Sequence, residues 1–292
     1  MPKVSLSKNN NSYQGTLAVL KPLENDLKEK LKKLDKIVIK INFVTTKKEL
    51  ATTPFDSVKG FIDFIKPFYK KKIIIAEEAS IGNTKSGFAS YGFTDLANSD
   101  PQVEVFDSGD DEVEEEIIKY ENHRLSLPFA NIFTNSPFIV SITRAKTHDF
   151  VVVTLGIKNI LVGAIQGGMP NRVKIHRGYD IHKILAKISK IVYPDFVLID
   201  GVVGMQGNGP DKGFAKNSGW LMAGFDALAV DSLAAYLMGF DIKDIGYLNL
   251  IHQLRLGKLY AQDKIEVIGN EPKNLVDPYK HHDTFSSQRL WK

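Results

Sequence analysis

The chain has 292 residues, of which 43% are hydrophobic and 25% charged, a composition typical of a globular protein with a large buried core. Its 38 basic and 34 acidic residues leave a formal net charge of +4, an excess too small and too scattered to indicate a nucleic-acid-binding surface. The chain has no cysteine, which excludes disulfides, thiolate nucleophiles and any iron–sulfur cluster ligated by its own thiolates, and which suits a reducing cytoplasm.

Two segments bear on export and membrane attachment. Residues 1–11 are polar and lack the apolar core of a secretory signal. The most apolar stretch, residues 151–168, contains Lys158, Asn159 and Gln166 and is marginal in length for a membrane span, so it predicts a buried core helix. We therefore expect a cytoplasmic protein that does not bind a membrane.

The first part of the chain alternates between helix and strand patterns. Apolar residues at helical spacing predict an amphipathic helix over residues 17–34, and an alternating pattern over residues 36–42 predicts a strand. Thr53 as N-cap and Pro54 as first helical residue predict a second helix that extends to about residue 69. A β-branched run over residues 72–77 predicts the next strand.

The remainder continues this pattern. Further strands are predicted at residues 103–107, 138–143, 196–200 and 265–268, and helices at residues 181–191, 226–238 and 242–256. This order predicts a single α/β domain over residues 1–270, with a mostly parallel or mixed β-sheet flanked by helices. The polar residues 271–292 are expected to be a tail that is either loose or laid across the surface. Ligands of such sheets bind at the carboxyl ends of strands, where Asn42 and Glu77 fall.

The strongest local anomaly is a lysine in an apolar helix. Lys158 and Asn159 have apolar neighbours on every helical face. A buried ammonium is costly unless it is paired, so Lys158 needs a carboxylate, a cluster of carbonyls or an anionic ligand. Perturbed lysines of this kind cluster at functional sites, although a snorkelling lysine at a helix edge would give the same pattern.

A second polar cluster, residues 144–149, contains Arg144, Lys146 and His148 and follows the strand predicted at residues 138–143. Its cations therefore fall at the carboxyl end of a strand, where the N-terminus of the next helix would present free amides to an anion. Such a turn is by itself usually solvated surface, but together with the lysine on the next helix it indicates an anion site.

A glycine-rich segment, residues 200–213, follows another apolar strand and includes Asp200, Gly207, Asn208 and Gly209. Glycines permit positive φ angles and close approach of the backbone to a ligand. The order G-x-x-G-x-G, followed by proline, departs from the Rossmann fingerprint, and the chain has no P-loop frame. Classical NAD or ATP binding is therefore disfavoured.

Two aspartates fall on the helix predicted at residues 226–238. Asp226 fits an N-cap. Asp231 lies about 140° further round the helix among small apolar residues, so we expect it to be buried and to pair with Lys158 or Lys146. The histidines and carboxylates of the chain match no metal-binding spacing, so an anionic ligand is favoured over a metal and no metal ligands are assigned.

Several short motifs occur together in a fixed order. They are Lys40-Ile41-Asn42, Thr53-Pro54, Glu77 to Ser80, Lys146-Thr147-His148, Gly156-Ile157-Lys158-Asn159, His176, Asp200-Gly201, Gly207-Asn208-Gly209-Pro210, Asp226 and Asp231. This set resembles the family of domain of unknown function 362 over residues 36–270. The resemblance implies a microbial α/β protein with shared polar positions. Many relatives also carry a ferredoxin-like cluster domain, which this cysteine-free chain cannot form, so electron transfer would need a separate redox partner.

The leading hypothesis is an enzyme that acts on a small anionic molecule in a cleft at the carboxyl ends of the strands. The catalytic candidates are His148, His176 and Lys158, because histidine moves protons near neutral pH. The candidate ligand-binding residues are Lys40, Asn42, Glu77, Lys146, Asn159, Arg172, Asp200, Gly207, Asn208, Gly209 and Asp231. Among them, cationic Lys40, Lys146 and Arg172 would hold the anion together with Lys158.

Two alternatives remain open. The chain would fit a non-catalytic binding or accessory protein that works with a separate redox or biosynthetic partner. Lys158 and Asp231 would also fit a purely structural buried pair. The sequence names neither the substrate nor a cofactor.

Overall fold

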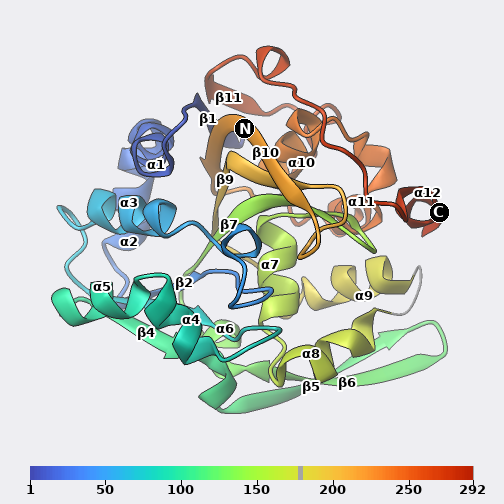
Figure 1. The fold of residues 1–292 in the computed structure, drawn as a ribbon, viewed down its shortest axis with the longest axis horizontal. Coiled ribbons are helices and arrows are strands. Elements are labelled where there is room, and N and C mark those ends of the chain that lie inside the picture. The colour runs from blue at the N-terminus through green and yellow to red at the C-terminus, as the bar shows by residue number, and fades with distance from the viewer. Residues whose placement is uncertain (177–179, 292) are drawn as a thin grey trace.

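The computed structural model describes residues 1–176 and 180–291, and a large mixed β-sheet runs through its centre (Figure 1). Within the described residues this sheet has nine strands, in the order β11-β1-β10-β9-β7-β2-β3-β4, with β8 paired to β7. The strands are β1 (Lys3–Lys8), β2 (Lys36–Lys40), β3 (Lys72–Glu77), β4 (Val103–Asp107), β7 (Ile139–His148), β8 (Val152–Thr154), β9 (Phe196–Gln206), β10 (Phe214–Gly224) and β11 (Glu266–Gly269). A separate antiparallel hairpin joins β5 (Val113–Tyr120) to β6 (His123–Ala130).

Helices cover both faces of the sheet, as predicted for an α/β fold. They are α1 (Ser12–Leu20), α2 (Glu24–Leu31), α3 (Phe55–Ile65), α4 (Thr84–Ser90), α5 (Phe93–Ser99), α6 (Asn131–Thr134), α7 (Gly156–Gly163), α8 (Gly168–Arg172), α9 (Asp180–Ile188), α10 (Ala227–Leu237), α11 (Gly246–Gln253) and α12 (Phe285–Gln288). Alternate side chains of β2 enter two separate cores: Ile37 and Ile39 pack with α1, α2 and α3, whereas Val38 packs with α7, α9, α10 and α11. By the same alternation, Lys40 faces the α7 side.

Five neighbouring strands, β9, β7, β2, β3 and β4, run parallel. Their carboxyl ends therefore lie along one edge of the sheet. The register pairs Lys40 of β2 with Ala76 of β3 and with Ser141 of β7. Chain segments far apart in sequence thus bring their polar ends together here.

The turn predicted at residues 144–149 is wrong. Strand β7 continues through His148, and Arg144, Lys146 and His148 are all buried in it. The strand is prolonged because its last residues pair with β8, Lys146 opposite Thr154 and His148 opposite Val152. The cations nonetheless fall at the carboxyl end of a strand, as expected.

The single buried helix predicted for residues 151–168 is also wrong, because this segment divides into β8, α7 and the start of α8. The division occurs at Gly156, where a Cβ atom would lie 2.3 Å from Val197 of β9. Only glycine lets the first turn of α7 approach the sheet this closely. Lys158, the third residue of α7, therefore lies close to the carboxyl ends of the strands.

Other boundaries differ in detail. The prediction of Thr53 as the N-cap of α3 is wrong, because Pro54 occupies that position. The Thr53 hydroxyl instead donates to the carbonyl of Ile142 at 2.8 Å and accepts the N–H of Asn42 at 2.8 Å. Asp226 is confirmed as the N-cap of α10 and accepts the N–H of Ala229 at 3.0 Å. The sequence reading missed β1, β10 and the β5–β6 hairpin, all of which pair antiparallel with a neighbour.

The C-terminal tail is laid across the surface and contributes buried groups. The Gln288 side chain, in a residue only 4% exposed, donates to the carbonyl of His148 at 2.9 Å and accepts the N–H of Val152 at 2.5 Å. Val152 has a φ of 70°, a left-handed conformation that a β-branched residue rarely adopts. Gln288 therefore holds the hairpin between β7 and β8 in a strained shape. The described residues contain no helix that is long and apolar enough to cross a membrane.

We expect Gln288→Ala to lower the free energy of unfolding by about 1–3 kcal/mol, because it leaves the Val152 N–H and the His148 carbonyl without their partner in a buried site. Equilibrium urea unfolding measures the change. Ser287→Ala is the matched control, since within the described chain the exposed Ser287 hydroxyl bonds only to the carbonyl of Thr284. An equal loss in both variants would show that Gln288 has no special role.

Candidate functional site

A cavity of about 400 Å³ lies at the carboxyl ends of the parallel strands. Its walls come from the ends of β2, β3 and β7, from α7 and α8, and from the loop between β9 and β10. The lining residues are Asn42, Val44, Glu77, Ser80, Ile81, His148, Asp149, Phe150, Thr154, Lys158, Asn159, Val162, Gly163, Met169, Arg172, Val173, His176, Pro210 and Asp211. Seven of the predicted site residues therefore share one cavity: Asn42, Glu77, His148, Lys158, Asn159, Arg172 and His176.

A buried ion pair forms part of the cavity floor. Lys40 Nζ lies 2.5 Å from Glu77 Oε2 and also donates to the carbonyl of Ile41 at 2.6 Å. Burial lowers the pKa of Lys40 and raises that of Glu77, and the attraction between the two charges opposes both shifts. A Cβ on Gly163 would lie 2.5 Å from Lys40 Nζ, so α7 can cover the pair only with glycine at this position.

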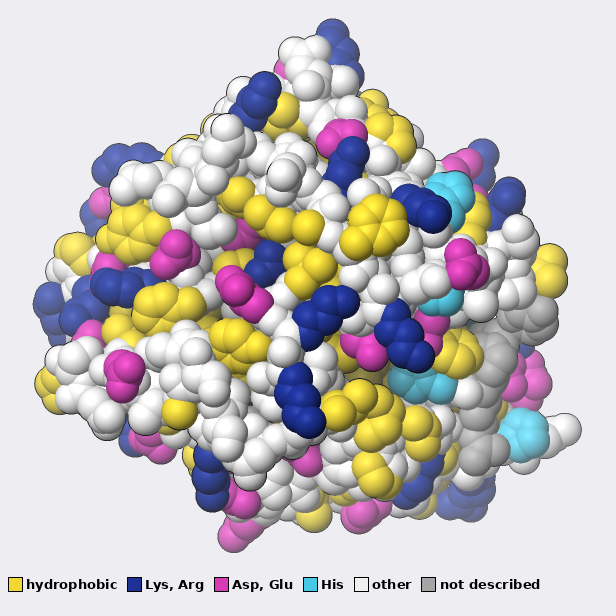
Figure 2. Space-filling view, in the orientation of Figure 1, with side chains coloured by type: hydrophobic (Ala, Val, Ile, Leu, Met, Phe, Trp, Pro, Cys, Tyr) yellow, Lys and Arg dark blue, Asp and Glu magenta, His cyan; other side chains and the backbone are white. Residues whose placement is uncertain are grey.

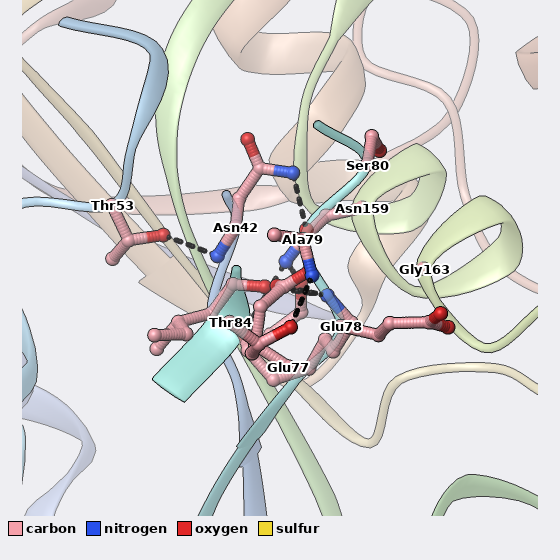
Figure 3. Close-up of polar contacts among 12 residues, drawn as sticks. Asn42, Thr53, Glu77, Glu78, Ala79, Ser80, Thr84, Asn159 and Gly163 are labelled. Atoms are coloured by element: carbon pink, nitrogen blue, oxygen red, sulfur yellow. Dashed lines mark hydrogen bonds and ion pairs between the residues drawn. The ribbon is translucent and has the colours of Figure 1, made fainter. Parts of the chain in front are cut away.

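An amide network adjoins this pair, and Figure 3 shows Asn42 and Asn159 meeting above the end of β3. The Asn42 amide donates to Asn159 Oδ1 at 3.1 Å, and Asn159 donates to the Ser141 hydroxyl at 3.0 Å. Lys146 donates to Asn42 Oδ1 and to the carbonyl of Ala51. The Lys146 ammonium thus already has oxygen partners within the protein, and burial places its pKa well below the usual value.

Lys158 differs from these two lysines. It is 5% exposed and lines the cavity, yet its ammonium makes no hydrogen bond or ion pair with any residue that the structure describes. Burial lowers the pKa of Lys158 to about 8; the Arg172 charge also lowers it, and the Asp149 carboxylate opposes the shift. The amino group is therefore desolvated and open to a ligand.

His148 and His176 stack beside Lys158, with ring centroids 6.0 Å apart. His148 Nδ1 lies 3.0 Å from the N–H of Phe150 and 3.0 Å from the Asp149 carboxylate, two contacts that favour opposite tautomers of the ring. His176 Nδ1 lies 2.8 Å from the carbonyl of Arg172, which only accepts, so Nδ1 of that ring carries the proton and Nε2 has the lone pair. His176 thus offers a nitrogen lone pair as an acceptor.

Both imidazoles are neutral at physiological pH. Burial lowers the pKa of His148 to about 3 and that of His176 to about 4, and the charge of Lys158 contributes to both shifts. The Asp149 carboxylate lies 3.0 Å from His148 Nδ1 and opposes the first shift. His148 and His176 are therefore neutral groups beside the Lys158 ammonium.

Arg172 supplies charge but few free donors. Its guanidinium donates to the carbonyls of Ile165 at 3.2 Å and Glu78 at 2.8 Å and to the Ser80 hydroxyl at 2.8 Å. These bonds tie α8 to the end of β3. Of the four cations expected to hold an anion, Lys40, Lys146 and Arg172 already have protein partners, and only Lys158 has none among the described residues.

The remaining predicted ligand-binding residues lie outside this cavity. Asp200 accepts the Ser57 hydroxyl at 2.6 Å and the Val202 N–H at 2.8 Å. The Gly207 carbonyl accepts the Thr147 hydroxyl at 2.8 Å. Asn208 and Gly209 line an adjoining cavity of about 650 Å³, which shares Asp149, Phe150 and Asp211 with the first.

The pairing of Asp231 with Lys158 or Lys146 is wrong. The Asp231 carboxylate accepts the N–H groups of Gly156 and Ile157, each at 2.9 Å. It therefore caps the N-terminus of α7, the end at which free amides were expected to meet an anion. Burial raises the pKa of Asp231 to about 8, and these two hydrogen bonds oppose the rise.

Sequence reasoning missed Thr154, which lines the cavity one residue before the backbone N-cap of α7. Its buried hydroxyl has no hydrogen-bond partner within the described chain. No pattern in the sequence marks it, because β8 itself was not predicted. Among the described residues, no group of three or more histidines and carboxylates is arranged to hold a metal ion. On the face shown in Figure 2, basic and acidic side chains are interspersed.

Among the solved structures that resemble the chain, two share little sequence identity with it. The lactate racemase apoprotein from Thermoanaerobacterium thermosaccharolyticum superposes with a TM-score of 0.51 and 16% identity, over 82% of this chain and 57% of that chain. A protein from Thermotoga maritima matches with a TM-score of 0.42 and 10% identity, over 85% of this chain and 60% of that one. The first likeness shows a shared α/β fold.

Comparison of sequences gives a family and a curated relative. A thylakoid-associated protein of Synechocystis is 27% identical over 141 residues, which are 47% of this chain and 43% of the relative, so the match spans less than half of that protein. Residues 37–236 match the model of the family described as Domain of unknown function (DUF362). Since this range includes every motif from Lys40 to Asp231, the chain belongs to the DUF362 family, as its ordered motifs indicated.

Proposed function

We propose that the cavity binds a small organic anion and exchanges a proton with it. The observation that carries the proposal is Lys158, a desolvated cation that faces the cavity without a partner among the described residues. A buried ammonium is stabilised by an anion placed against it, and an anionic ligand supplies the missing charge. The volume of about 400 Å³ lies within the usual range of pockets for small molecules.

The two histidines provide for the proton. The Nε2 lone pair of His176 can accept a proton from the ligand, and the neutral His148 ring lies next to it. The unpartnered Thr154 hydroxyl adds a donor at the same wall. The Lys158 ammonium, the Thr154 hydroxyl and the His176 lone pair therefore line one small space.

The choice of first ligands follows from size and charge. One fold neighbour is a lactate racemase apoprotein, a protein named for a short hydroxy acid. That likeness concerns the fold alone, and the match covers 57% of that chain, so the proposal rests on the cavity. Lactate and pyruvate are nevertheless suitable probes, since each is a small carboxylate with a neighbouring oxygen.

We expect Lys158→Ala to weaken lactate binding, measured by isothermal titration calorimetry, by about 2–5 kcal/mol, because a desolvated charge partner is lost. Lys187→Ala on the exposed face of α9 is the control and keeps the wild-type affinity. Equal affinity in wild type and Lys158→Ala would refute the proposed anion site.

The same anchor predicts a pH dependence of binding. An ammonium attracts the anion and a neutral amine does not, so affinity is present below the Lys158 pKa of about 8 and falls as the pH rises through it. Lys158→Arg keeps its charge over this range, since the pKa of arginine lies above about 12. Titrations from pH 6.5 to 9.5 should therefore give a falling affinity for wild type and a flat profile for Lys158→Arg.

We expect His176→Gln and His148→Ala to bind pyruvate with an affinity within about tenfold of wild type, but to lose at least about 10²-fold in exchange of the methyl C–H hydrogens of pyruvate, which its ketone makes acidic, with deuterated solvent, followed by NMR. The reason is that the imidazoles transfer the proton rather than supply the charge. A ligand that binds without any exchange in the wild type would favour the alternative, a binding or accessory protein.

A further inference from the structure

We propose that Lys158 is also an amine nucleophile, and that the cavity accepts a small 2-oxo acid whose carbonyl carbon condenses with this lysine to form an imine. The inference rests on the proposed function, because the same cavity must first admit the carboxylate. It goes further by naming a covalent step and the carbonyl group that the ligand must carry.

The position of the amino group supports this role. Lys158 stands in the first turn of α7, and that turn is fixed by the Asp231 carboxylate on the N–H groups of Gly156 and Ile157. The close packing of Gly156 on Val197 fixes it against the sheet as well. A nucleophile on a rigid element loses little freedom when it meets a bound carbonyl.

The hydrogen-bond partners of the three buried lysines distinguish Lys158 from Lys40 and Lys146. Glu77 stabilises the Lys40 ammonium, and oxygen atoms of Asn42 and Ala51 accept from Lys146. No carboxylate, amide or carbonyl of the described residues accepts from Lys158. Desolvation without a partner and a nearby guanidinium lower the pKa of Lys158, so its ammonium releases a proton more readily than that of an exposed lysine.

The condensation balances with groups already in the cavity. The Lys158 ammonium first gives one proton to His176 Nε2, and the amine nitrogen then bonds to the carbonyl carbon as the C=O π bond breaks, while the Thr154 hydroxyl donates a hydrogen bond to the developing oxyanion. His176 passes this proton to the oxygen and then transfers a second proton from nitrogen to the same oxygen, which leaves as water when the C–O bond breaks. The nitrogen keeps its third proton, so the products are a protonated C=N bond and one water molecule, with no oxidant or reductant.

A 2-oxo acid fits better than a simple aldehyde because of charge. Protonated imine nitrogen keeps the positive charge that the ammonium carried, directly beside the carboxylate of the same ligand. The anion therefore remains compensated in the desolvated cavity after the covalent bond forms. A neutral carbonyl compound would leave that charge buried without a partner.

The experiment is reductive trapping of the full chain with pyruvate and sodium cyanoborohydride, read by intact mass and peptide mapping. We expect one added reduced pyruvate per chain, located on Lys158, and loss of labelling at least about tenfold in Lys158→Arg and Lys158→Met. Lys187→Arg on the exposed side of α9 should label like wild type, and excess lactate should compete with pyruvate.

The outcomes separate the two proposals. Lactate binding that depends on Lys158, without any trapped pyruvate on this residue, would overturn the imine and leave the anion site standing. Labelling spread over surface lysines, unchanged in Lys158→Arg, would likewise overturn it. Absence of both lactate binding and trapping would remove both proposals, and urea unfolding of each variant confirms that the folded protein was tested.

Discussion

Desolvation of cations at the carboxyl edge of the sheet is the constraint on which the site depends. Lys40, Lys146 and Lys158 are all buried within one small region. Each charge removed from water costs several kcal/mol unless nearby oxygens replace the lost hydration. Oxygen atoms of the protein accept from Lys40 and Lys146, whereas none of the described residues accepts from Lys158. This difference, and not the residue type, separates the structural lysines from the functional candidate.

Asp231 explains why an anionic ligand in the cavity would contact the Lys158 side chain and not the N-terminus of α7. A helix N-terminus offers free N–H groups that bind anions well. In α7 the Asp231 carboxylate already occupies the N–H groups of Gly156 and Ile157 from the core side. Asp231 thereby anchors α7 to α10. The positive group of α7 that faces the cavity is therefore the ammonium of Lys158, the next residue in the sequence.

The sequence predicted the parts of the fold whose pattern is local. Strands β3 and β4 lie at residues 72–77 and 103–107 as expected, because β3 is a short apolar run inside the parallel sheet and β4, at its edge, begins with alternating apolar and polar residues. Strand β10 was missed, since its first half, with Lys216 and Asn217, is exposed and polar and pairs with a strand identified only in part. The end of β7 was taken for a turn because burying Arg144 and Lys146 in a strand requires partners such as Val203 and Ala51 that no local pattern reveals.

The sequence predicted which residues meet at the candidate site, but not which hydrogen-bond partners they have there. Seven predicted residues share the cavity because strand ends of a parallel sheet converge whatever the details of the loops. Which cation remains without a partner depends on contacts among β2, β3, β7 and α8, which are distant in sequence.

The two histidines also depend on contacts that are distant in sequence. Both rings are buried and neutral, so sequence and burial make them equivalent. Their hydrogen-bonding surroundings differ, since the Arg172 carbonyl accepts from His176 Nδ1, whereas His148 Nδ1 faces the Phe150 N–H and the Asp149 carboxylate. The conformation that brings the Phe150 amide to His148 belongs to a hairpin whose strained end at Val152 is held by Gln288, more than a hundred residues away. The C-terminal tail is therefore part of what distinguishes two identical side chains.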